Sequence, residues 1–240
     1  LINVAPMETR VAVLDNGVLQ EVYIERTEKR GLVGNIYKGK VVRVLPGMQA
    51  AFVDIGLERA AFIHAADIIT IDENGMESRS DNVPDIRTLV HDGKSLVVQV
   101  VKDPISSKGA RLTTHLSISS RFLVYMPYTN HIGISQKIEK EEERERLRTI
   151  VEECLPKENR ERAGGFIVRT VAETATSEEI QTDALFLQKL WGDLKPGLGS
   201  FAVPNVIYND LPLFMRTMRD AVKPGIEKFA SIHTKNICAC

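Results

Sequence analysis

The chain has 240 residues, of which 43% are hydrophobic and 26% are charged, and its formal net charge is −1. This composition is typical of a globular protein of one or two domains and excludes a disordered chain. Because positive and negative charges nearly cancel, a nucleic-acid site must come from a local cluster of cations. No apolar run reaches the length of a membrane span, so we expect no membrane partner.

The N-terminus and the cysteines predict a cytoplasmic protein. No basic segment followed by an apolar one starts the chain, so we expect no secretion signal. The cysteines are odd in number, and Cys238 and Cys240 are too close for the usual zinc-knuckle spacing. We therefore expect no disulfide framework and no metal site in this chain.

Residues 1–34 are expected to form short strands. Asn16-Gly17 separates two β-type runs, 10–14 and 18–25, and Asn-Gly in this position is a strong hairpin signal. Since a lone hairpin is only marginally stable, it must pair with a later part of the chain.

Residues 35–114 predict a small β-barrel. β-branched runs and a Pro46-Gly47 turn fill 35–63, and a polar loop, a short helical turn and two more strands follow. Phe52 and Phe62 lie on strands either side of one tight turn. The cations Lys38, Lys40, Arg43 and Arg59 surround them.

Aromatic faces for bases and cations for phosphates are what an OB-type barrel uses to hold single-stranded nucleic acid. The alternative is that both rings are ordinary barrel core, which is the commoner state of Phe, and that the cations are solvated. Lys108 and Arg111, in the turn at 106–111, are further phosphate candidates, and the alternative for them is a solvated turn.

Residues 115–205 predict an inserted α/β unit. Strands are expected at 122–126 and 166–169, and helices at 139–154 and from the Thr176-x-x-Glu179 capping box to Leu194. The second strand ends in Arg169-Thr170, whose guanidinium fork and hydroxyl suit a terminal phosphate monoester. The alternative is an Arg169 paired with a nearby carboxylate.

Residues 206–240 begin with a predicted strand at 206–208. A helix is expected from 210 to 223, with Leu211, Phe214, Met218 and Ala221 facing inward and Pro224-Gly225 ending it. The tail at 229–240 has neither a helical nor a strand period.

Several of these segments carry a resemblance to a known family. The stretch NIYKGKVVRVLPGMQAAFVDIGLERAAFIH at 35–64 resembles the start of the S1-type RNA-binding domain of the ribonuclease E/G family, nearest to its ribonuclease G branch. The resemblance continues through VVQVVKDPISSKGARLTTHLSI, FLVYMP, GISQKIE, GGFIVRTVAE and RDAVKPGIEK, and covers about Ile2 to Lys228.

The resemblance implies an α+β fold with an insertion. An S1-type OB-fold barrel (35–114) and an α/β 5′-sensor region (115–205) would interrupt a ribonuclease-H-like subdomain, of which 1–34 is the first part and 206–240 a truncated second part. That subdomain would supply the partner for the N-terminal hairpin.

The resemblance also implies a function. The chain would be the RNA-binding N-terminal portion of an endoribonuclease that cleaves single-stranded RNA in rRNA maturation and mRNA turnover, with a preference for 5′-monophosphorylated ends. The resemblance carries an RNA-binding role to Lys108 and, less directly, to Arg111, which join Phe52, Phe62 and Lys38, predicted above from the barrel pattern, as the expected RNA-binding residues. The matching positions for the 5′-phosphate are Val124, Arg169, Thr170 and Ser120, where ribonuclease E has glycine in place of Ser120.

The family's catalytic machinery belongs to later domains. Its acidic pair for Mg²⁺ and its zinc-linked Cys-Pro-x-Cys dimer motif are absent from these residues, and no converging acidic pair replaces them. We therefore predict no catalytic residue, no cofactor and no ribonuclease activity for this chain alone. Homo-oligomers are implied only for the full-length family. A stand-alone, non-catalytic RNA-binding module is the alternative.

The tail after Lys228 is expected to be a frameshift product. Codons can be chosen so that another reading frame restores the Ile-Asp-Ser that the family places there. The hairpin at 1–34 would then lack covering strands, and its exposed edge would be prone to self-association.

Overall fold

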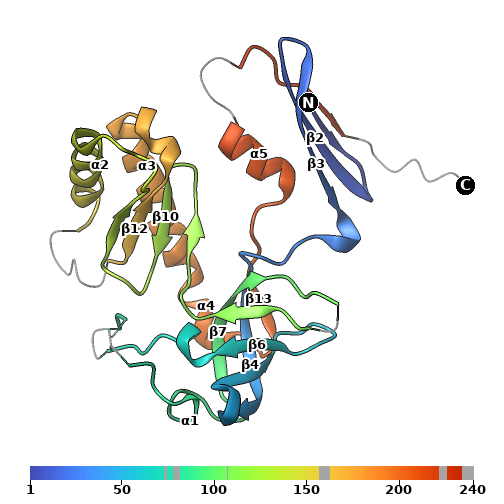
Figure 1. Ribbon diagram of the computed structural model, residues 1–240, viewed down its shortest axis with the longest axis vertical. Coiled ribbons are helices and arrows are strands. Elements are labelled where there is room, and N and C mark those ends of the chain that lie inside the picture. Colours follow the sequence, from blue (N-terminus) through green and yellow to red (C-terminus); the bar gives the residue numbers. More distant parts are fainter. Residues whose placement is uncertain (73–74, 78–81, 107, 157–162, 222–225, 234–240) are drawn as a thin grey trace, which may run out of the picture. The chain divides into compact units, whose positions relative to one another are not determined.

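The computed structural model describes residues 1–72, 75–77, 82–106, 108–156, 163–221 and 226–233 (Figure 1). The fold is mixed α+β and divides into two compact units. Residues 1–31 and 210–240 form the first unit, and residues 32–209 form the second. The second unit is therefore an insertion between the two parts of the first.

The first unit is a four-stranded sheet with strand order β14-β1-β2-β3. Its strands are β1 (Ile2–Val4), β2 (Glu8–Asp15), β3 (Val18–Arg26) and β14 (Ser231–His233). Asn16 and Gly17 both have positive φ, 49° and 79°, which is the backbone of the predicted Asn-Gly turn between β2 and β3. The hairpin prediction is confirmed.

Helix α5 (Leu213–Ala221) packs on β2 and β3 (Figure 1). The Glu25 carboxylate accepts hydrogen bonds from the Leu213 N–H at 3.0 Å and from the Arg216 guanidinium at 3.1 Å. The inward position predicted for Met218 is wrong, since this residue is 44% exposed. A helix that contacts two strands of a small sheet has little apolar surface to bury against. The predicted stop at Pro224-Gly225 lies outside the described residues.

The tail contains a strand that its sequence pattern did not indicate. β14 pairs in parallel with β1, and the Ile2 N–H donates to the Ala230 carbonyl at 2.8 Å. Three residues are too few to show a period, so only the tertiary partner defines this strand. Residues 234–240, with Cys238 and Cys240, lie outside the described part of the chain.

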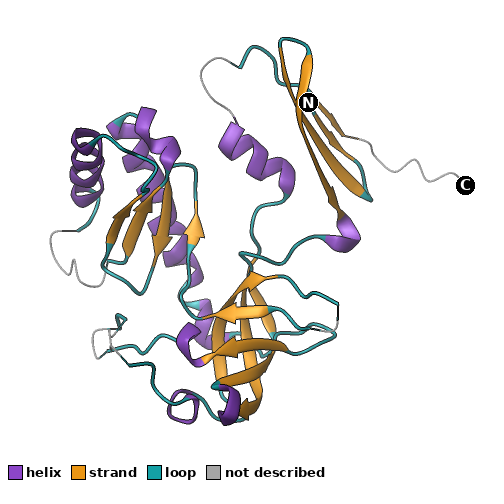
Figure 2. Cartoon of the chain, in the orientation of Figure 1, coloured by secondary structure: helices purple, strands orange, loops and turns teal. Residues whose placement is uncertain are grey.

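The second unit contains a closed five-stranded barrel, which is consistent with an OB-fold. Its strands are β4 (Ile36–Leu45), β5 (Ala50–Asp54), β6 (Ala61–His64), β8 (Arg111–Thr113) and β7 (Ser95–Lys102), and pairing of β4 with β7 closes it. Figure 2 shows these strands in orange as a barrel. Helix α1 (Ile86–Leu89) packs beside β4, and Val41, Val53, Ile63 and Leu112 fill the interior.

Strand β13 (Asn205–Tyr208) differs from expectation. Predicted as part of the segment 206–240, it pairs instead with Ile36–Lys38 of β4 and belongs to the second unit. β5 pairs with β4 only from Lys40 onward, which leaves the beginning of that strand edge open to another partner. Which strand edge is open for pairing depends on how the barrel closes, so the local sequence pattern of β13 cannot predict its partner.

A second sheet follows the barrel, with strand order β11-β12-β10-β9. Its strands are β9 (Ile118–Ser119), β10 (Leu123–Met126), β11 (Ile132–Ile134) and β12 (Gly165–Val168). Helices α2 (Glu141–Glu153) and α3 (Ser177–Leu194) pack on it and on each other, and α4 (Gly197–Ser200) follows. Short 3₁₀ turns occupy Thr27–Lys29, Pro46–Met48, Ala65–Asp67 and Thr170–Thr174.

The predicted capping box begins α3. The Thr176 side chain accepts from the Glu179 N–H, and the Glu179 carboxylate accepts from the Thr176 N–H. The buried face of the sheet carries Leu123 and Phe166, which pack in one core with Leu187. The opposite face keeps Val124 half-buried and Ile167 37% exposed. The end of β12 and its neighbours therefore remain accessible on that face.

Candidate nucleic-acid interface

Phe52 and Phe62 lie on the outer face of the barrel. Successive side chains of a strand point to opposite faces of the sheet. Ala51, Val53 and Ile63 are therefore completely buried, whereas the two rings are half-buried and lie outside the barrel core. The rings are direct cross-strand partners, with centroids 5.9 Å apart and planes at 64°. This is an edge-to-face pair with π surface available for stacking.

His64 extends the aromatic pair along β6. Its ring lies edge-on to Phe62, with 4.9 Å between the centroids. This residue was not among the predicted site residues. Its place beside Phe62 could have been predicted, because residues two apart on a strand share a face.

The turn that carries Lys108 is pressed against β6. A Cβ on Gly109 would lie 2.1 Å from the Ala60 carbonyl oxygen, so this position requires glycine. The Phe62 N–H donates to the Ala110 carbonyl at 2.7 Å, and Lys108 itself is exposed. The close approach therefore places an exposed cation beside the strand of Phe62.

Arg111 and Lys38 have partners of their own. Arg111 is the register partner of Phe62, and its guanidinium contacts the Asp67 carboxylate at 3.0 and 3.2 Å. The Lys38 ammonium donates to the Gly199 carbonyl at 2.9 Å. Lys38 pairs with β7 and β13, not with β5, so the structure does not bring it to the aromatic pair.

The second group of predicted residues lies around the end of β12. The Arg169 N–H donates to the Phe122 carbonyl at 2.8 Å. Its Nη1 donates to the carbonyl oxygens of Ser120 at 2.6 Å and Arg121 at 3.0 Å. The Thr170 hydroxyl lies 3.0 Å from that of Ser135 and is exposed. One guanidinium thus links the end of β12 to the loop before β10.

The Ser120 hydroxyl is engaged by helix α3. It is buried and donates to the Asp183 carboxylate of α3. The same carboxylate accepts the N–H groups of Phe122 and Leu123. Asp183 was not among the predicted site residues. Its position could have predicted a structural role. Asp183 lies three residues after the buried Ile180, on the packed side of a helix, and a carboxylate in such a place needs hydrogen-bond donors.

Val124 joins this region from the open face of the sheet. Its register partners are Ser119 on β9 and Ile167 on β12. Val124, Arg169 and Thr170 therefore lie at the same end of the two central strands, where β10 begins and β12 ends. The arrangement offers a guanidinium, a hydroxyl and an apolar wall, a combination that suits a phosphate next to a nucleoside.

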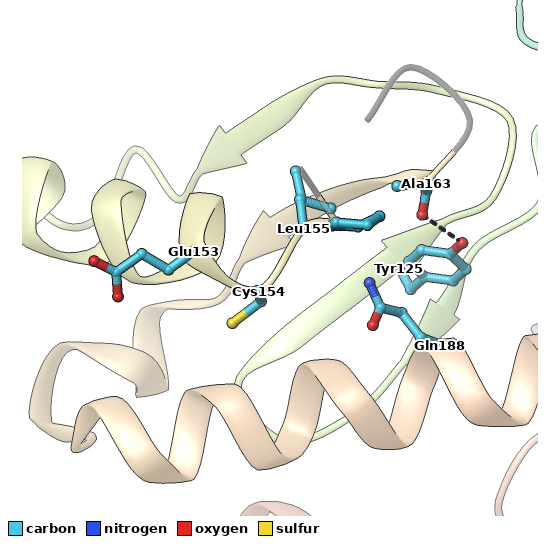
Figure 3. A pocket seen from close by; sticks show the side chains of 7 residues that line it. Tyr125, Glu153, Cys154, Leu155, Ala163 and Gln188 are labelled. Atoms are coloured by element: carbon cyan, nitrogen blue, oxygen red, sulfur yellow. Dashed lines mark hydrogen bonds between the residues drawn. The ribbon is translucent and has the colours of Figure 1, made fainter. Parts of the chain in front are cut away.

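A hollow of about 480 Å³ opens between β10 and the end of α2 (Figure 3). Tyr125, Cys154 and Gln188 line it, and the Tyr125 hydroxyl donates to the Ala163 carbonyl at 2.9 Å. Burial raises the pKa of Tyr125 to about 12 and also raises the pKa of the Cys154 thiol. The raised pKa favours the protonated thiol, which is a poor nucleophile.

No group of three or more His, Cys, Asp or Glu side chains within the described ranges could hold a metal ion. In the same part of the chain, no helix is both long and apolar enough to cross a lipid bilayer.

Comparison with known proteins identifies relatives of the whole chain. Residues 117–237, half of the chain, match the model of the ribonuclease E/G family. The chain is 50% identical to ribonuclease G of Haemophilus influenzae over 232 residues, covering 95% of this chain and 46% of the relative. It is also 50% identical to ribonuclease G of Escherichia coli K12 over 230 residues, with the same coverage.

A more distant relative is ribonuclease E of Haemophilus influenzae, 35% identical over 223 residues, which covers 91% of this chain and 23% of the relative. The chain therefore spans less than half the length of these relatives.

Proposed function

The chain belongs to the ribonuclease E/G family, and from this premise we propose that it is the RNA-binding N-terminal portion of a ribonuclease G-type endoribonuclease. The whole enzyme cleaves single-stranded RNA in the cytoplasm, in rRNA maturation and mRNA turnover. The remainder of the protein supplies the catalytic carboxylates, their Mg²⁺, the structural zinc site and the homo-oligomer contacts.

The observation that carries the proposal is the outward aromatic pair. Phe52 and Phe62 offer two adjacent rings on the outer face of the barrel, and Lys108 is exposed in the turn that lies against the strand of Phe62. Stacking on aromatics with flanking cations binds single-stranded RNA without a sequence code. We assign the rings to bases and Lys108 to a phosphate.

The site formed by Val124, Arg169 and Thr170 is the proposed 5′-end sensor. A terminal monophosphate has more charge and more acceptor oxygens than a diester, and a planar guanidinium can meet two of these oxygens. Ser120 contributes through its backbone carbonyl, which positions Arg169, because its hydroxyl is occupied by Asp183.

The decisive experiment measures the affinity of the chain for a single-stranded RNA with a 3′ fluorophore. Phe52→Ala and Phe62→Ala should each weaken binding roughly 5- to 150-fold, since stacking contributes about 1–3 kcal/mol per base. Phe186→Ala on α3 is the matched control, because it removes the same kind of ring from a surface position, 57% exposed, on another element.

Lys108→Ala should lower the slope of log K against log salt by about 0.7, one phosphate contact on a single strand. Thermal unfolding monitors the fold of each variant. Unchanged affinity in folded Phe52→Ala and Phe62→Ala would refute the proposal.

A stand-alone binding module is the competing function. Sequencing the remainder of the gene distinguishes the two functions. A continuous reading frame with a ribonuclease G-type catalytic domain supports the nuclease, and the absence of such a domain supports the module.

A further inference from the structure

Four outward side chains stand in register across the barrel. Arg43 on β4 opposes Phe52 on β5, Phe52 opposes Phe62 on β6, and Phe62 is paired with Arg111 on β8. Residues in direct register project from the same face of a sheet. Arg43, Phe52, Phe62 and Arg111 therefore form one cross-strand row, with a cation at each end and two aromatic rings between.

The row has the dimensions of a short nucleic-acid strand. Neighbouring strands lie about 4.8 Å apart, so its three steps cover roughly 14 Å across the barrel. A strand that stacks successive bases on the two rings would carry its backbone phosphates past both ends of the row.

A β-bulge places Arg43 in the row. Val41 opposes Val53, so an unbroken ladder would put Val42 opposite Phe52. The register shifts between Val41 and Arg43, so Val42 and Arg43 together oppose Phe52, and both side chains are exposed. Bulges next to functional sites commonly re-aim one side chain, and this one adds a guanidinium next to Val42 as an outward neighbour of the aromatic pair.

The two ends of the row differ in availability. At one end the Asp67 carboxylate occupies Arg111. At the other end Arg43 is exposed, and no carboxylate among the described residues is paired with it. A phosphate can reach Arg43 without displacing an acid, whereas at Arg111 it competes with Asp67.

We propose that Arg43 binds a backbone phosphate of the single-stranded RNA whose bases stack on Phe52 and Phe62, so that the RNA crosses the barrel from β4 to β8. The inference rests on the proposed function and assigns Arg43 the role expected of Lys38, whose ammonium is held by Gly199. Arg43 contributes more to the salt dependence of binding than Arg111 does, and Lys38 contributes none.

The test compares the salt dependence of binding to a 3′-labelled oligouridylate. Arg43→Ala lowers the slope of log K against log salt by about 0.7, and Arg43→Lys keeps it. The control is Arg148→Ala, which removes an exposed arginine from α2 and leaves the slope unchanged. Lys38→Ala also leaves it unchanged.

A charge-preserving swap tests position rather than charge. The double variant Arg43→Ala/Leu185→Arg keeps the net charge of the natural chain, but its arginine lies at an exposed position on α3, outside the row, so it behaves like Arg43→Ala. Equal slopes for the natural chain and Arg43→Ala, or equal losses in Arg43→Ala and Arg148→Ala, would overturn the inference. The proposed function fails separately, when Phe52→Ala and Phe62→Ala bind normally.

Discussion

The Ser120 hydroxyl donates a hydrogen bond to the Asp183 carboxylate, which joins the loop before β10 to helix α3. The carboxylate also accepts the N–H groups of Phe122 at 2.9 Å and Leu123 at 3.0 Å. From the other side, Arg169 donates to the carbonyl oxygens of the same loop. One acid and one base thus satisfy the donors and the acceptors of a single turn, which fixes the wall of the proposed 5′-end sensor.

Removing the acid should loosen this turn. Asp183→Ala leaves three donors without their acceptor, so we expect a loss of roughly 1–3 kcal/mol in the free energy of unfolding. Urea unfolding followed by the fluorescence of Trp191, buried on the same helix, measures it. Asp193→Ala, an exposed acid of α3, is the control and should change stability by less than about 0.5 kcal/mol. Equal stability of both variants would contradict the role of Asp183.

Local signals in the sequence predicted the elements whose causes are local. The capping box at Thr176 and the Asn16-Gly17 turn each depend on residues close in the chain, and the structure contains both. The alternation around Phe52 predicted a strand but not which side faces inward. Phe and Val are both apolar, so only closure of the barrel decides that Val53 is buried and Phe52 is not.

Contacts between distant segments could not be predicted in this way. The pairing of β13 with β4 depends on which strand edge the barrel leaves open. The bulge that turns Arg43 toward Phe52 is defined by register with β5. Asp183 lies 63 residues after Ser120, and no spacing rule connects a helix acid to a loop hydroxyl at that separation.

Arg169 should carry the discrimination between RNA ends. In competition binding with matched oligonucleotides, the natural chain should prefer a 5′-monophosphate to a 5′-hydroxyl. A charged hydrogen bond contributes about 1.5–3 kcal/mol, so Arg169→Ala should lose most of that preference. Equal affinity of the natural chain for both ends would contradict the sensor.

A second variant separates binding from support of the loop, because Arg169 also holds the carbonyl oxygens of Ser120 and Arg121. Thr170→Val removes only an exposed hydroxyl and keeps the shape of the side chain. It should weaken the preference while the midpoint of thermal unfolding stays close to that of the natural chain. An unchanged preference would remove Thr170 from the sensor.

The chain alone should not cleave RNA. The carboxylates that hold Mg²⁺ in the family are expected in the remainder of the protein, so single-stranded RNA incubated with this chain and Mg²⁺ should remain intact. The assay follows a labelled oligonucleotide by gel electrophoresis, with a chelator as control. Magnesium-dependent cleavage that co-purifies with the chain through several columns would contradict this expectation.

Tyr125 should make stability depend on alkaline pH. Burial raises the pKa of its phenol to about 12, above the value of about 10 in an unfolded chain. Because the folded-state pKa is the higher one, this contribution to stability is fully present below about pH 10 and is lost as pH rises toward about 12.

Tyr125→Phe has no such titration. It should be less stable than the natural chain near neutral pH by about 0.5–1.5 kcal/mol, since the hydrogen bond to Ala163 is lost. Urea unfolding at a series of alkaline pH values should show this difference shrink as the tyrosine of the unfolded natural chain ionises. A difference that stays constant across that range would show that Tyr125 titrates normally in the folded protein.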